Sequence, residues 1–267
     1  MNLPFNIINA ARAGYQLMIQ ERRYLLRLAL IPVLIKLVCY VTALSLGFED
    51  NMVRMALILL PASLVEGWML AHVIRLITLG QRWPFKPTGD MEADMGVLRS
   101  RMHGVMGGLV SYALINVLLA GLLALLTSFA PDMAEGAQPT PSDAGHAMLS
   151  LIIMSVMIWA FPLLWVFIPL SLSMDAREWL KEVRGMRFSL PMIAVWLLCF
   201  LPTAAVLMIG VNAILSPFPE GAVPVGARFA VIILSVILDT VKALIGTAGM
   251  TFALGEYFAN KGSRKVA

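Results

Sequence analysis

Residues 188–215 read FSLPMIAVWLLCFLPTAAVLMIGVNAIL, an apolar run without a single charged side chain. A helix needs about 20 such residues to cross the roughly 30 Å hydrocarbon core of a bilayer. Five further runs satisfy this requirement, and the six predicted spans are about Leu25–Leu46, Met55–Leu79, Val105–Phe129, Met148–Leu172, Phe188–Leu215 and Ala230–Leu254. We therefore predict an all-α fold, a polytopic transmembrane helical bundle that forms one domain over residues 1–267.

The composition of the whole chain supports this prediction. Of its 267 residues 60% are hydrophobic and only 13% are charged, and the mean hydropathy is +0.83. Soluble domains carry about 25% charged residues, so that disordered chains, nucleic-acid-binding tails and ordinary water-soluble enzymes are excluded. We expect membrane lipids as partners, together with another membrane protein or a second copy of the chain, and no nucleic acid.

Basic residues are distributed unevenly between the predicted connections. They gather before the first span, between the second and third, between the fourth and fifth, and at the C-terminus, whereas residues 130–146 contain no Lys or Arg. Because basic residues collect on the cytoplasmic side of a membrane, both termini are expected in the cytoplasm. The segment 130–147, rich in Pro, Gly, Ala and Asp, is expected to be a flexible outer loop.

Short amphipathic helices are predicted on the cytoplasmic side before spans 1, 3 and 5. Their apolar residues recur at steps of three or four: Phe5, Ile8, Ala11, Tyr15 and Met18; then Met91, Met95, Leu98 and Met102; then Ala176, Trp179, Leu180 and Val183. Asp175 is placed to cap the third of these helices. Such helices lie in the headgroup plane or pack against the ends of a bundle.

Four ionisable residues fall deep inside the predicted spans: Lys36, Glu66, Asp239 and Lys242. Counted from the outer span ends, they lie about 15, 17, 14 and 18 Å deep, near one plane. A central charge costs about 2.5–3.5 kcal/mol, so that the four should neutralise one another, Asp239 with Lys242 and Lys36 with Glu66. They form either polar contacts that fix helix packing or an intramembrane polar centre that binds an ion, a proton or a polar solute.

A second group of candidate residues lies between the fourth and fifth spans. It consists of the basic residues Arg177, Lys181, Arg184 and Arg187. Basic residues at this level attract anionic lipid headgroups. These four are therefore candidate lipid-headgroup contacts.

The sequence contains no recognisable catalytic or cofactor motif. The patterns GxxxxGK[ST], GxGxxG, GxSxG and HExxH do not occur, and Cys39 and Cys199 stand alone inside apolar runs. No disulfide framework, metal site or cofactor is therefore expected, and we predict that the protein is not an enzyme.

Two stretches of the sequence resemble a known kind of protein. The opening Phe5…Tyr15…Arg22-Arg23-Tyr24…Leu30-Ile31-Pro32 and the later Ser173-Met-Asp175-Ala-Arg177…Arg184-Gly-Met-Arg187 are similar to a family of uncharacterised bacterial integral inner-membrane proteins with about six spans. This resemblance implies a bacterial plasma-membrane location and cytoplasmic termini, and it transfers no catalytic or ligand residues.

Three functions follow from these patterns, in order of preference. The first is a non-enzymatic accessory or scaffold component of an envelope process, because the loops are short and the deep charges compensate one another. The second is a transporter or channel for an ion or small polar solute, with Lys36, Glu66, Asp239 and Lys242 at its centre. The third is lipid handling through the cytoplasmic amphipathic helices.

Overall fold

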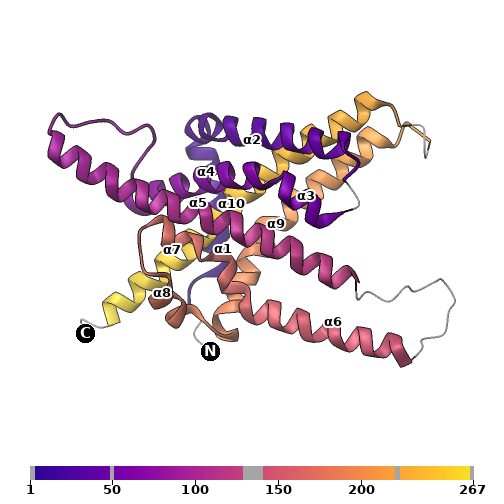
Figure 1. Ribbon diagram of the computed structural model, residues 1–267. Coiled ribbons are helices and arrows are strands. Elements are labelled where there is room, and N and C mark those ends of the chain that lie inside the picture. Colours follow the sequence, from indigo (N-terminus) through magenta and orange to yellow (C-terminus); the bar gives the residue numbers. More distant parts are fainter. Residues whose placement is uncertain (1–3, 49–50, 129–140, 220–222, 265–267) are drawn as a thin grey trace.

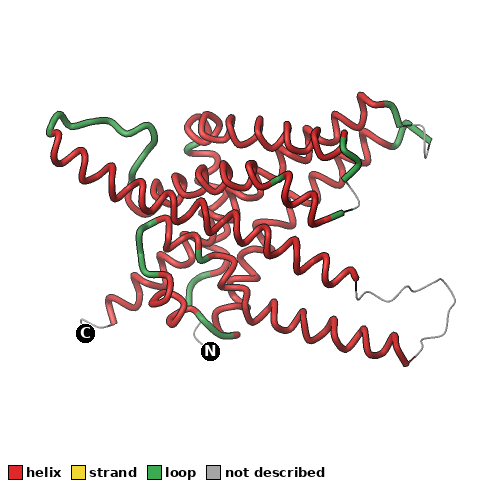
Figure 2. Tube along the Cα trace, in the orientation of Figure 1, coloured by secondary structure: helices red, strands yellow, loops and turns green. Residues whose placement is uncertain are grey.

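A computed structural model of the chain describes residues 4–48, 51–128, 141–219 and 223–264. Its elements are α1 (Ile7–Gln20), α2 (Arg22–Ser45), α3 (Met52–Ile58), α4 (Leu60–Leu79), α5 (Met91–Ser128), α6 (Pro141–Ala160), the 3₁₀ helix η1 (Phe161–Trp165), α7 (Phe167–Ser171), α8 (Ala176–Val183), α9 (Met186–Leu215) and α10 (Val225–Arg264). Within these ranges there are helices and loops and no strand (Figures 1 and 2). Six helical stretches are long and apolar enough to cross a membrane, so that the predicted all-α bundle is confirmed.

The long helices run between two ends of the bundle. In Figure 1 the α4–α5 connection, residues 80–90, lies at the left, whereas the α2–α3 and α9–α10 connections lie at the right. We call the left end, where α2 and α5 begin and α4 ends, the basic end. The chain thus passes back and forth between the two ends.

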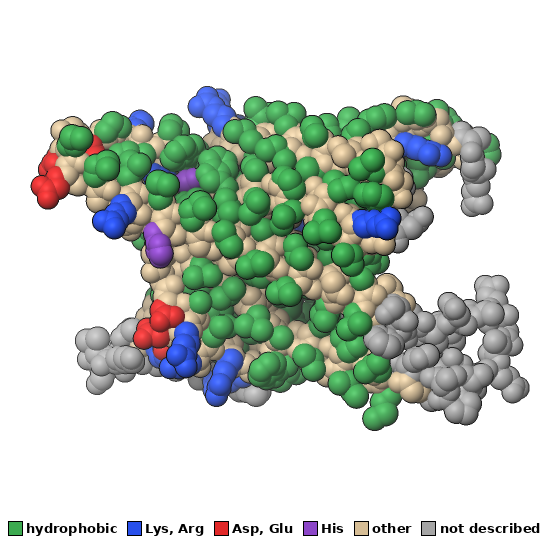
Figure 3. All heavy atoms as spheres, viewed as in Figure 1, with side chains coloured by type: hydrophobic (Ala, Val, Ile, Leu, Met, Phe, Trp, Pro, Cys, Tyr) green, Lys and Arg blue, Asp and Glu red, His purple; other side chains and the backbone are tan. Residues whose placement is uncertain are grey.

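Helix α4 is the central helix of the bundle. It packs against α2, α5, α7 and α10, and every residue from Met69 to Arg75 is buried. Other helices expose large apolar side chains instead; on α2 these recur every four residues, at Leu26, Leu30, Leu34 and Val38. Figure 3 shows the resulting hydrophobic surface between the charged ends. The hydrocarbon layer of a bilayer would cover this surface, because apolar side chains carry no free-energy penalty when they are exposed to lipid.

Two of the predicted spans are not single straight helices. The segment 55–79 is divided at Leu59 into α3 and α4, and Pro61 lies in the first turn of α4. The segment 148–172 passes from α6 through η1 to α7, with Pro162 in η1 and Pro169 in α7. Proline removes a backbone donor and clashes with the preceding turn, which explains both breaks.

The predicted flexible loop 130–147 is wrong in part. Residues 141–147 belong to α6, which begins at Pro141. The remainder of that prediction, and Phe129 at the end of the third predicted span, lie outside the described residues.

The three predicted amphipathic helices have different outcomes. Residues 91–103 are not a separate helix but the first turns of α5, and Met91, Met95 and Met102 are exposed there. Residues 176–183 form α8, whose start is capped by the Asp175 carboxylate and whose Trp179 and Val183 are buried. The placement of α8 on the cytoplasmic side stays a prediction.

Helix α1 lies against the side of α10, as part of the bundle. The backbone N–H of Asn6 donates to Glu256 near the end of α10, while Gly14 approaches Ile245 and Gly249, earlier in α10. α1 therefore runs antiparallel to α10. Its inner face is made of the small residues Ala10, Ala11 and Gly14, and the predicted stripe residue Ile8 is exposed. Small side chains let two helices approach closely. The other predicted stripe residues do face the bundle: Phe5 and Ala11 are buried, and Tyr15 and Met18 pack against the core.

The Tyr15 hydroxyl joins α1 to a break in the hydrogen bonding of α9. Pro202 has no N–H to offer the Leu198 carbonyl one turn before it. The Tyr15 hydroxyl donates to that carbonyl and to the Cys199 carbonyl, at 3.1 Å each. Partial burial raises the pKa of Tyr15, so that the phenol keeps the proton that it donates.

We expect Tyr15→Phe to lower the free energy of unfolding by about 0.5–1.5 kcal/mol, because the Leu198 carbonyl would lose its partner while packing is preserved. Denaturant titration in mixed micelles measures this difference. Tyr257→Phe in α10 is a chemically matched control. Equal stability of wild type and Tyr15→Phe would show that the bond does not hold α1 in place.

Candidate functional site

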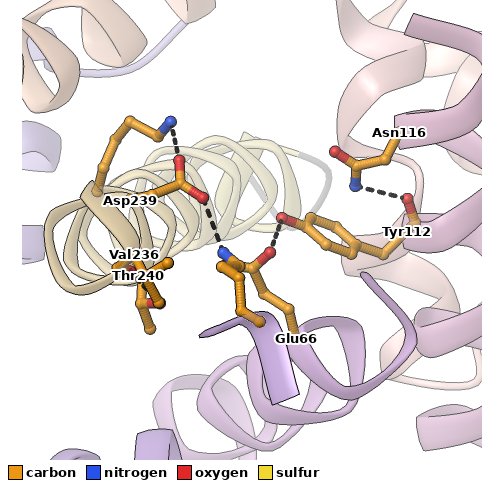
Figure 4. A network of polar contacts seen from close by, with 8 residues as sticks. Glu66, Tyr112, Asn116, Val236, Asp239 and Thr240 are labelled. Atoms are coloured by element: carbon orange, nitrogen blue, oxygen red, sulfur yellow. Dashed lines mark hydrogen bonds and ion pairs between the residues drawn. The ribbon is translucent and has the colours of Figure 1, made fainter. Parts of the chain in front are cut away.

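The four deep charges meet in one continuous chain of ion pairs. Lys36 Nζ on α2 lies 2.6 Å from Glu66 Oε1 on α4 and 2.7 Å from Asp239 Oδ2 on α10. Lys242, three residues further along α10, pairs with the other oxygen of Asp239. Figure 4 shows this chain from close by, with Asp239 and Glu66 labelled. The sequence predicted the two outer pairs, and the structure adds the central Lys36–Asp239 link.

A tyrosine that the sequence analysis did not single out completes the network. The Tyr112 hydroxyl of α5 donates to Glu66 Oε2 at 3.0 Å, and the Asn116 side chain donates to the Tyr112 carbonyl at 2.9 Å (Figure 4). The available signal was the spacing of Tyr112 and Asn116, four residues apart on one face of a span that has no charge near its middle. We call Lys36, Glu66, Tyr112, Asp239 and Lys242 the polar network.

The two halves of the polar network differ in burial. The side chains of Lys36 and Glu66 are 5% and 6% exposed, whereas those of Asp239 and Lys242 are 34% and 37% exposed. Lys242 is covered in part by the Phe200 ring, whose centroid lies 5.8 Å from its amine. The network is therefore closed on the α2–α4 side and partly open on the α10 side.

The pairing explains how charges can be kept in the middle of a membrane. Two amines and two carboxylates sum to zero charge, and both oxygens of each carboxylate have a partner. A buried charge is tolerated when its partners and remaining hydrogen bonds are all supplied. Each oxygen of Glu66 has one partner from another helix, so that the bonds of Lys36 and Glu66 link α2, α4, α5 and α10.

Three of the predicted lipid-contact residues, in α8 and directly after it, lie around a hollow. Arg177, Lys181 and Arg184 line a hollow of about 390 Å³, together with Trp159, Ala160, Pro162, Leu163 and Leu180 from α6, η1 and α8. Arg187, in the first turn of α9, is not among the residues that line it. Contact of these basic residues with lipid headgroups stays a prediction.

Metal-ligating residues are not clustered in the part of the chain that the structure describes. No group of three or more His, Cys, Asp or Glu side chains within it could hold a metal ion. Cys39 and Cys199 are buried and separate, as free thiols.

Comparison with known proteins supplies no relative for this chain: no protein-family model, curated protein or solved structure matches it.

Proposed function

We propose that this protein is a non-enzymatic integral membrane protein that serves as an accessory or scaffold component of an envelope process. The single observation that supports this proposal is the full pairing of the polar network, in which Lys36 and Glu66 are buried against each other. A transport site needs a group that can release one partner and accept a solute. Here each carboxylate oxygen already has a partner, and three of these four bonds join different helices, which favours a role in holding the bundle together.

We place the protein in the plasma membrane of a bacterium with both termini in the cytoplasm. The basis is the excess of Arg and Lys in the segments at the basic end. Its partners would be membrane lipids and either another membrane protein or a second copy of the chain. Reporter fusions after Lys86 and after Arg184 should report the cytoplasm, and export of either reporter would refute this orientation.

Flux measurements in proteoliposomes test the scaffold role directly. With an entrapped pH-sensitive dye and an imposed potential, we expect proton entry to equal that of protein-free liposomes, and Glu66→Gln to change nothing. Native extracts should contain the chain in a discrete complex larger than the single chain. Proton or solute flux that Glu66→Gln abolishes, or a chain that migrates alone in native extracts, would contradict the proposal.

A transporter is the second candidate, and one observation favours it. The side chains of Asp239 and Lys242 are about one third exposed at mid-depth on α10, and intramembrane charges of this kind often mark ion or proton pathways. The same proteoliposomes distinguish the two functions, because transport through this half would be lost in Asp239→Asn. Flux that is absent in wild type as well would exclude this candidate.

A further inference from the structure

A large cavity opens at the basic end, between the start of α2 and the α4–α5 connection. Its volume is about 670 Å³. Four arginines line it, Arg22, Arg23, Arg27 and Arg82. The apolar part of its lining includes Leu28, Ile31, Trp68 and Trp83. The cavity is separate from the polar network and from the hollow beneath α8.

The charge of this cavity is strongly positive. Arg82 is paired with Glu21, at 2.6 Å, but Arg22, Arg23 and Arg27 form no ion pair with any residue that the structure describes. Since Glu21 is the one acidic residue in the lining, three positive charges stay uncompensated. An anion entering the cavity would meet guanidinium groups suited to bidentate bonds with phosphate oxygens.

Two buried arginines near the cavity, Arg101 and Arg75, add to this positive charge. Arg101 is 4% exposed, its guanidinium lies 5.7 Å from the centroid of the Trp83 ring, and it donates to the Arg82 carbonyl. Its Nε has no hydrogen-bond partner. Arg75, which is 3% exposed, donates to the Ser171 carbonyl and to Gln81. Neither has a carboxylate within 4 Å among the described residues.

The depths of the lining residues in the membrane match the layers of a lipid molecule. With Lys36 near mid-depth and a rise of about 1.5 Å per residue, Ile31 and Leu28 lie about 8 and 12 Å toward the basic end, within the hydrocarbon layer. Arg27 lies at about 14 Å, at the edge of that layer, and Arg23 at about 20 Å, at headgroup level. Apolar lining at the depth of the acyl chains, with arginines at the depth of the headgroups, fits an amphiphile with an anionic head.

We propose that this cavity binds a phosphate group, carried by an anionic phospholipid whose acyl chains lie along Leu28, Ile31 and Trp68 while Arg23 and Arg27 hold its phosphate. This inference is independent of the scaffold role, because it uses none of the polar network. Basic pockets between membrane helices are suited to anionic headgroups, since each basic side chain near the surface contributes about 1 kcal/mol of attraction.

Native mass spectrometry of the full chain in detergent tests the site by titration with dioleoylphosphatidylglycerol. Dioleoylphosphatidylcholine, with the same acyl chains and no net charge, is the second arm, and inorganic phosphate is the third. We expect the first lipid to bind with preference, and Arg23→Gln/Arg27→Gln to weaken that binding about ten- to thirtyfold. Glu21→Gln should strengthen it, because this change removes the one acidic group and frees Arg82.

The matched control is Lys86→Gln/Arg99→Gln, which removes the same charge from exposed positions outside the cavity. It should leave lipid binding unchanged. Equal losses in the control and in Arg23→Gln/Arg27→Gln, or equal binding of the two lipids, would overturn the site. Arginine-dependent binding of inorganic phosphate without binding of the phosphatidylglycerol would overturn the lipid as its source. Circular dichroism of each variant verifies that the helices are intact.

Discussion

Replacing Lys36 by Met is expected to lower the free energy of unfolding by about 3–5 kcal/mol, because it leaves buried carboxylates without their central counter-charge. Among the residues that the structure describes, Glu66 would lose its one cationic partner, and Asp239 would keep Lys242. Unfolding in mixed micelles of increasing SDS content, followed by circular dichroism, measures the change. A loss below about 1 kcal/mol would mean that the network does not hold the helices together.

The double variant Lys36→Met/Glu66→Met separates the loss of pairing from the loss of volume. Both replacements are close in size to the residues removed, and the Asp239–Lys242 pair stays neutral. A buried ion pair replaced by apolar groups often leaves stability unchanged, so that the double variant should recover most of the loss. If the two single losses simply added, Lys36 and Glu66 would not be energetically coupled.

An exposed ion pair provides the control for burial. Arg82 and Glu21 are paired at 2.6 Å, but their side chains are 60% and 24% exposed. Arg82→Gln should cost about 1 kcal/mol or less, because solvent screens such a pair. A loss as large as that of Lys36→Met would show that burial is not the cause of the difference.

Gly104→Ala is expected to cost about 2–4 kcal/mol, through overpacking and the loss of a charged hydrogen bond. A Cβ at this position would lie 2.5 Å from the Ser171 carbonyl oxygen and 2.8 Å from Arg75 Nη1. The Ser171 carbonyl is the acceptor of the Arg75 guanidinium, at 3.0 Å. Helices α5 and α7 would have to separate, and Arg75 would lose this bond.

Gly96→Ala is the matched control in the same helix, since no atom lies within 4 Å of its added Cβ. We expect it to stabilise the protein by about 0.5–1 kcal/mol through helix propensity alone. Both variants are compared by the same micelle titration. A Gly104→Ala variant as stable as Gly96→Ala would show that the α5–α7 contact is not close-packed in solution.

The deep charges show how far sequence reasoning reaches into the site. Their common depth follows from counting residues along each span, because every helix rises by the same amount per residue. Their pairing follows from the cost of an isolated charge in lipid. Tyr112 could not be found in this way, because a tyrosine carries no such cost until a carboxylate lies beside it. The role of Asp239 as a shared partner of Lys36 and Lys242 depends on how α2 and α10 are rotated toward each other.

The amphipathic stretches show where sequence reasoning fails. The stretch 91–103 is predicted to be a separate short helix, whereas it forms the first turns of α5, where Met91, Met95 and Met102 are exposed. On α1 the predicted stripe includes the buried Phe5 and Ala11, but it leaves out Ala10 and Gly14, which are buried as well. Close helix contact depends on small side chains and on the partner surface, and neither is visible from one segment alone.

The amino-acid sequence by itself determined that this chain is a helical bundle with six membrane-crossing segments, because in lipid an apolar run must satisfy its own backbone and only a helix does so within one segment. It also determined that the deep charges must compensate one another. Tertiary structure alone decided that α1 packs along α10, that Tyr112 joins Glu66, and that arginines from two separate segments meet around one cavity. The physical reason is that periodicity sets which side of a helix is apolar, whereas the neighbour that covers each side is chosen by close packing among all the helices.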